Sequence, residues 1–106
     1  MGEEERIDAI LIWGSYAKRE ESARSDVDIC IVAPGVDPYL LYKRTLKVGG
    51  LDGRLDIKIF ELLPLYLKME VIRDHEIIYA RDRLRLYEYF YFFRKLWADQ
   101  KRRQRL

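Results

Sequence analysis

The fold is decided by residues 6–32, which read RIDAILIW-GS-YAKREESARS-DVDICIV. Six of the first eight residues are apolar, and the β-rich run ends at a Gly-Ser pair, so it predicts a short buried strand. Residues 26–32 form a second apolar run that is ended by a Pro-Gly pair, which predicts a second strand. The polar stretch at residues 16–24 tolerates helix, and we expect a turn or two of helix there.

Strand and helix signals alternate through the rest of the chain. Asp37-Pro38 is typical of an N-cap followed by proline at the first helical position, and Gly49-Gly50 ends that helix. The remaining elements are expected at residues 54–60 (a strand with alternating polarity), 64–73 (a helix), 75–79 (a short strand) and 81 onwards (a long helix). This order predicts an α/β or α+β fold with helices packed on a small sheet of about four strands.

Length and composition limit the class of protein. A chain of 106 residues predicts one domain, residues 1–106, with one core. Hydrophobic residues make up 49%, and 20 Lys+Arg stand against 18 Asp+Glu, which excludes a disordered chain and a dedicated polyanion binder. The single cysteine, Cys30, lies in an apolar run and predicts a core residue rather than a disulfide. Without an apolar run long enough for a membrane span, the expected compartment is the cytoplasm.

Three carboxylates are the candidate metal ligands. Asp26 and Asp28 lie at i and i+2 of the second strand, so both project from one face, about 6.6 Å apart along the chain. Asp56 begins the polar face of the third strand at the same relative height. Together they suit a pair of hard divalent cations about 3.5–4 Å apart. The alternative is structural: strand-entry residues that cap a turn, and an acid on a solvated strand face.

A candidate phosphate site lies upstream of the acids. Gly14 and Ser15 stand where the first strand turns towards a helix. Glycine lets the backbone approach closely, and free N–H groups with the Ser15 hydroxyl can hold a phosphate. Lys18 and Arg19 follow about one helical turn later, either to contact the phosphate or to lie on the solvated helix surface.

The Gly-Ser pair, the ten residues after it, the Asp-Val-Asp triplet and the later acid resemble the minimal nucleotidyltransferases of the DNA polymerase beta superfamily. The resemblance implies the nucleotidyltransferase fold and transfer of a nucleoside monophosphate from an NTP to an acceptor hydroxyl, with release of pyrophosphate. It implies that Gly14 and Ser15 hold the β- and γ-phosphates. It also implies that Asp26 and Asp28 bind two Mg²⁺ ions, and that Asp56 binds the catalytic ion and accepts the acceptor's proton.

The chain departs from the family pattern at two places. Arg19 stands about where many members have glycine, so a bulky cation either clamps or crowds the triphosphate there. Only Met1–Glu5 precede the first strand, where most members have a helix, and part of the sheet face is expected to lie uncovered.

The resemblance also implies a donor and a partner. The expected donor is ATP or another NTP. Similar proteins are paired with a small HEPN-domain toxin, and the antitoxin adenylylates a tyrosine of that toxin. Two alternatives stay open: transfer to the hydroxyl of a small molecule, and an antitoxin that neutralises its partner by binding alone.

The expected C-terminal helix is apolar on nearly every side. One group of side chains shares a face that the domain can bury, and a second group spreads around the other sides: these are Leu86, Phe90, Phe93 and Trp97, and then Tyr87, Tyr89, Tyr91, Phe92 and Leu96. Such a helix normally buries a second surface, so we expect a homodimer or a partner-protein interface there. The basic run at residues 101–105 is typical of a solvated helix end, and nucleic-acid contact is the less favoured interpretation.

Overall fold

The computed structural model describes residues 7–13, 27–48 and 55–104. Its centre is a four-stranded mixed sheet with the strand order β3-β2-β1-β4. The strands are β1 (Ala9–Trp13), β2 (Val27–Val32), β3 (Leu55–Ile59) and β4 (His75–Ala80). β1 pairs antiparallel with both β2 and β4, whereas β2 and β3 run parallel. The expected fold class, a small mixed sheet with helices packed on it, is confirmed.

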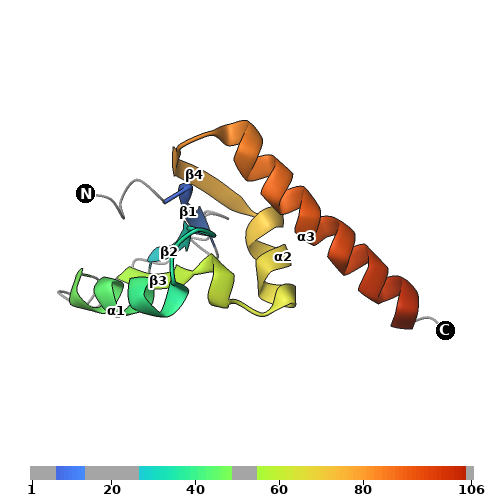
Figure 1. The fold of residues 1–106 in the computed structure, drawn as a ribbon, viewed down its shortest axis with the longest axis horizontal. Coiled ribbons are helices and arrows are strands. Elements are labelled where there is room, and N and C mark those ends of the chain that lie inside the picture. The colour runs from blue at the N-terminus through green and yellow to red at the C-terminus, as the bar shows by residue number, and fades with distance from the viewer. Residues whose placement is uncertain (1–6, 14–26, 49–54, 105–106) are drawn as a thin grey trace.

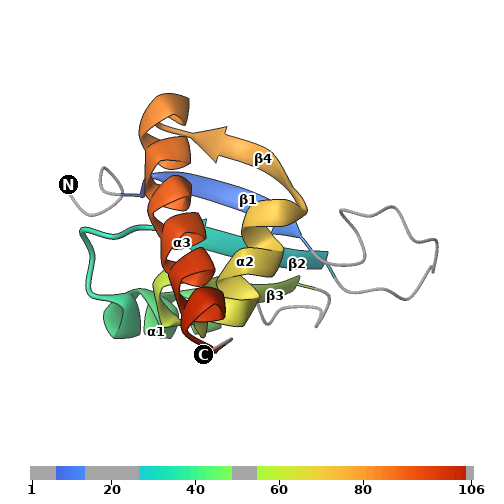
Figure 2. The same cartoon turned by 90° about the vertical axis from the view of Figure 1, so that its right-hand side faces the viewer.

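The helices lie on both faces of this sheet (Figures 1 and 2). They are α1 (Pro38–Val48), the short 3-10 helix η2 (Phe60–Leu62), α2 (Leu65–Arg73) and α3 (Arg83–Gln104). α1 is the crossover between the parallel strands β2 and β3 and covers one face, while α2 and α3 cover the other. None of the helices in residues 7–13, 27–48 and 55–104 is long and apolar enough to cross a bilayer. The helix expected at residues 16–24, and Met1–Glu5, lie outside the described residues.

Two aspartates fix where helices begin. The Asp37 Oδ1 accepts from the backbone N–H groups of Tyr39 at 3.0 Å and Leu40 at 3.4 Å, so the expected N-cap of α1 is confirmed. The long C-terminal helix was expected to begin at residue 81, but it begins at Arg83. The reason is the same kind of cap, because Asp82 Oδ1 accepts from the N–H of Arg85 at 3.2 Å.

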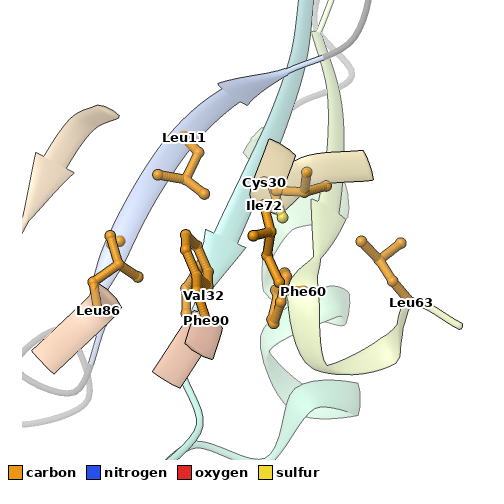
Figure 3. Close-up of a cluster of buried hydrophobic side chains, with 10 residues drawn as sticks. Leu11, Cys30, Val32, Phe60, Leu63, Ile72, Leu86 and Phe90 are labelled. Carbon is orange, nitrogen blue, oxygen red and sulfur yellow. The ribbon is translucent and has the colours of Figure 1, made fainter. Parts of the chain in front are cut away.

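Alternation along the strands divides the core into two clusters. Cys30 and Val32 of β2 pack with α2 and α3 in the larger cluster, and Ile31 packs on the α1 side. Figure 3 shows the larger cluster, where Phe60 and Phe90 meet with their ring centroids 5.5 Å apart. Cys30 is fully buried, as expected, and burial raises the pKa of its thiol above the usual range.

Phe60 and Tyr89 differ from the sequence-based expectation. The third strand was expected to run to residue 60, but it ends at Ile59, and Phe60 opens η2 as a fully buried core residue. The side of the sheet to which Asp56 projects is predicted correctly, but α2 and α3 cover this side at the Phe60 end of the strand. Tyr89 was expected on an outer side of the C-terminal helix. It is half-buried and donates its hydroxyl to Glu61 Oε2 at 2.8 Å.

Glu61 joins η2 to the residue after β2 and to α3 by hydrogen bonds. Its Oε1 accepts from the N–H of Ala33 at 3.1 Å, beside the bond from Tyr89. The ammonium of Lys68 lies 5.5 Å from the ring centroid of Phe60. Burial raises the pKa of Glu61 and lowers the pKa of Lys68, against the hydrogen bonds and the opposite charge that favour the charged forms.

The raised pKa of Glu61 gives a pH dependence with a definite sign. Between the ordinary value of 4.5 and the raised value, the folded state holds this proton more tightly than the unfolded state. The stabilisation is fully present below 4.5 and is lost as the pH rises through the folded pKa. As the pH rises across this interval, the free energy of unfolding in urea should therefore fall less for Glu61→Gln than for the wild type. Glu70→Gln, an exposed acid on α2, should follow the wild type; equal pH profiles for all three proteins would contradict the prediction.

Candidate active site

The strand register aligns four residues in one row across the sheet. Asp28 is the Cα partner of Asp56 on one side and of Trp13 on the other, and Trp13 is in turn the partner of His75. Trp13 ends β1, whereas Asp28 and Asp56 are each the second residue of a strand. The row Asp56-Asp28-Trp13-His75 therefore lies at the end of the sheet where β1 leaves and the other three strands begin.

Both acids of the row project to the same side of the sheet. Asp28 shares its face of β2 with Cys30, which packs in the cluster below α2 and α3. Asp56 alternates with Ile57, which packs on the α1 side, so its carboxylate projects opposite to α1. Neighbouring strands lie about 4.8 Å apart, a separation at which two carboxylates can share one cation.

The carboxylate of Asp56 is accessible and already next to a cation. Its Oδ2 lies 3.4 Å from Nζ of Lys58, and about half of each side chain is exposed. Lys58 stands two residues along the same strand and on the same face as Asp56. Lys58 was not among the predicted site residues; its i, i+2 spacing from Asp56 was the signal for this pair.

Trp13 is a second feature that the sequence analysis missed. Its indole Nε1 is buried, and no hydrogen-bond acceptor for it lies among the residues that the structure describes. Such buried unpaired donors are uncommon in folded proteins. The signal in the sequence was position alone, because Trp13 directly precedes Gly14.

His75, the first residue of β4, has a structural role. Its Nδ1 donates to the carbonyl of Val71 at 2.7 Å, and its ring packs edge-on against Phe90 with the centroids 5.5 Å apart. These contacts tie the first residue of β4 to the end of α2 and to α3. His75 thus anchors the outer end of the row.

The other predicted site residues lie outside the described part of the chain: Gly14, Ser15, Lys18, Arg19 and Asp26. All five belong to the connection between Trp13, the last residue of β1, and Val27, the first of β2. Their roles stay predictions.

The donor set of the row fits a hard divalent cation. Asp28 and Asp56 offer carboxylate oxygens, the ligands that Mg²⁺ prefers. Within the described residues, no three His, Cys, Asp or Glu side chains gather as a metal site. A third carboxylate would come from Asp26, two residues before Asp28, and the paired acids alone leave room for waters and phosphate oxygens as further ligands.

Comparison with known proteins decides the family. Residues 1–84 match the family described as Polymerase beta, Nucleotidyltransferase. The chain belongs to this nucleotidyltransferase family. The family match spans most of the chain, including the row of acids, and the resemblance expected from the Gly-Ser and Asp-Val-Asp pattern is confirmed. The protein is thus a nucleotidyltransferase.

Relatives of this nucleotidyltransferase have related names and folds. A Methanocaldococcus jannaschii protein, provisionally named a protein adenylyltransferase, is 48% identical over 100 residues, which cover 94% of this chain and 77% of that protein. A toxin-antitoxin crystal structure with AMP-PNP has a TM-score of 0.73 at 17% identity, covering 94% of this chain and 82% of the other. A complex of a tri-AMPylated Shewanella oneidensis HEPN toxin with an MNT antitoxin has a TM-score of 0.70 at 15% identity, covering 94% of this chain and 78% of the other. These solved structures establish the shared fold.

Proposed function

We propose that this nucleotidyltransferase moves AMP from ATP to a tyrosine hydroxyl of a HEPN-domain partner protein, as an antitoxin adenylyltransferase. The observation that carries the proposal is the register of Asp28 with Asp56 on adjacent parallel strands. It brings two carboxylates to one face in a chain of the polymerase beta nucleotidyltransferase family. The names of the relatives support the choice of donor and acceptor: one is a protein adenylyltransferase, and another is bound to an AMPylated HEPN toxin.

The acids have distinct roles in the proposed transfer. Asp26, Asp28 and Asp56 would hold Mg²⁺, which when bound neutralises charge on the triphosphate and favours the ionised acceptor oxygen. Asp56 accepts the proton of the acceptor hydroxyl as that oxygen forms its bond to the α-phosphorus. The bond from the α-phosphorus to the β-phosphate oxygen breaks, and pyrophosphate leaves.

The phosphate-binding residues act on the leaving group. Gly14 and Ser15 hold the β- and γ-phosphates, the part of ATP that departs. Lys18 and Arg19 contact the same phosphates, where positive charge favours the leaving group. Holding the leaving group in line with the acceptor makes the attack effectively unimolecular.

The exposure of Asp56 favours a macromolecular acceptor. About half of the Asp56 side chain is exposed. A small acceptor needs a pocket that buries most of its surface. A folded partner protein supplies the acceptor tyrosine together with the surface that encloses it at the site.

Transfer of label from ATP tests the proposal. With ATP radiolabelled at the α-phosphate, the wild type and Mg²⁺ should label a HEPN-domain protein encoded beside this chain, and mass spectrometry should locate AMP on a tyrosine. ATP labelled at the γ-phosphate should leave the partner unlabelled, and so should a partner with that tyrosine changed to phenylalanine. Inhibition of the partner without any label would favour an antitoxin that acts by binding alone. Label found only on small hydroxyl compounds would favour the small-molecule alternative.

A further inference from the structure

One face of α3 carries exposed apolar side chains followed by basic ones. We call it the outer stripe and define it by Leu84, Tyr87, Tyr91, Lys95 and Arg102, at relative positions i, i+3, i+7, i+11 and i+18. At 100° per residue these positions fall within about 80°, slightly less than one quarter of the helix circumference. Leu84, Tyr87 and Tyr91 are 69%, 48% and 59% exposed.

The outer stripe is not part of the domain's own core. Leu86 and Phe90, which are buried to 1% exposure, lie on the opposite side of the same helix and pack towards the sheet. The core side thus already has its partner in the sheet and α2. Leaving a large leucine and two tyrosines in water gives no stabilisation to an isolated domain, and apolar groups gathered in this way mark an interaction site.

Charge restricts what can bind there. α3 contains seven basic and two acidic residues, a net charge of +5. The apolar half of the stripe leads directly into the basic half, and Nζ of Lys95 lies 5.8 Å from the ring centroid of Tyr91. A complementary surface has an apolar groove for the leucine and tyrosines and carboxylates at the end that faces Lys95 and Arg102.

We propose that the outer stripe docks the acceptor protein through such an acidic, apolar groove. The inference rests on the proposed function, because it takes the acceptor to be a protein. A second copy of this chain fits less well, since pairing two α3 helices would bring together two segments of net charge +5. The stripe also lies on the side of the sheet to which Asp28 and Asp56 project. A protein docked on it therefore lies over the face of the sheet from which both acids project.

Affinity for the purified HEPN-domain acceptor tests the surface. Tyr91→Ala should weaken binding about thirtyfold, the effect of a central aromatic anchor. The double change Lys95→Glu and Arg102→Glu should slow association and make it less sensitive to salt. A matched control is Tyr39→Ala, which removes a similarly exposed tyrosine (67%, against 59% for Tyr91) from α1 on the opposite face of the sheet. Calorimetry and stopped-flow binding at two salt concentrations give these values, with thermal unfolding as a check on folding.

The outcomes separate this inference from the proposed function. The expected result is a higher KM for the acceptor protein with an unchanged kcat, and unchanged Mg·ATP binding, for the stripe variants. Wild-type AMP transfer together with normal acceptor binding by all stripe variants would overturn the docking surface. Acceptor binding that is lost in the stripe variants, with no AMP transfer by the wild type, would overturn the proposed function and leave the surface standing. A wild-type dimer that Tyr91→Ala converts to a monomer in sedimentation, with no change in acceptor binding, would assign the stripe to a second copy.

Discussion

Asp56→Asn should lower the rate of AMP transfer by about 10²- to 10⁴-fold, the range for loss of a general base. Its affinity for Mg·ATP should change far less, because the contribution of this carboxylate belongs mainly to the transition state. Asparagine keeps the shape of the side chain and cannot accept the proton. Single-turnover transfer gives the rate, and equilibrium titration with a non-hydrolysable ATP analogue gives the affinity.

Two variants control for the charge that this change removes. Lys58→Gln removes the ion partner of Asp56, at 3.4 Å, and leaves the carboxylate in place. Glu70→Gln removes an exposed acid on α2, away from the row. Both should keep the transfer rate within a few-fold of the wild type. Equal losses of rate and of affinity in Asp56→Asn would assign it a structural role instead of a role as base.

Changing Asp26 and Asp28 together to asparagine should abolish the stabilisation of the protein by Mg·ATP. A ligand present at a hundredfold excess over its Kd stabilises the folded state by about 2.7 kcal/mol. For a domain of this size that corresponds to a rise in Tm of more than about 10 °C. Thermal unfolding with and without Mg·ATP measures the gain.

Further melting curves control for binding of the metal or the nucleotide alone and for the loss of an acid elsewhere. Mg²⁺ alone and ATP with a chelator should each give the wild type only a small part of the rise, because the proposed site binds the two together. Glu70→Gln should keep the full rise. A double variant that still gains full stability with Mg·ATP would show that the donor nucleotide binds elsewhere on the chain.

Periodicity in the sequence was sufficient to predict the strands and helices and to predict that Asp28 and Asp56 lie at the same level of adjacent strands. The apolar runs predicted all four strands, and the alternation along residues 54–60 aligned Asp56 with Asp28. Element ends were less accurate, because a cap such as Asp82 decides where a helix begins. The hydrogen bond from Tyr89 to Glu61 could not be predicted, since it joins residues far apart in the chain that only packing brings together.

The position of β1 has a consequence for synthesis of the chain. β1 is made first among the described strands, yet it pairs with β4 as well as β2, with Ala9 opposite Ala80. On the ribosome, β1, β2 and β3 with both row acids emerge while one edge of β1 still lacks its neighbour. Such non-local pairing is slow, and an open strand edge is a template for aggregation. A nascent chain that stalls before His75 should therefore be prone to aggregate, although it already carries the acids of the row.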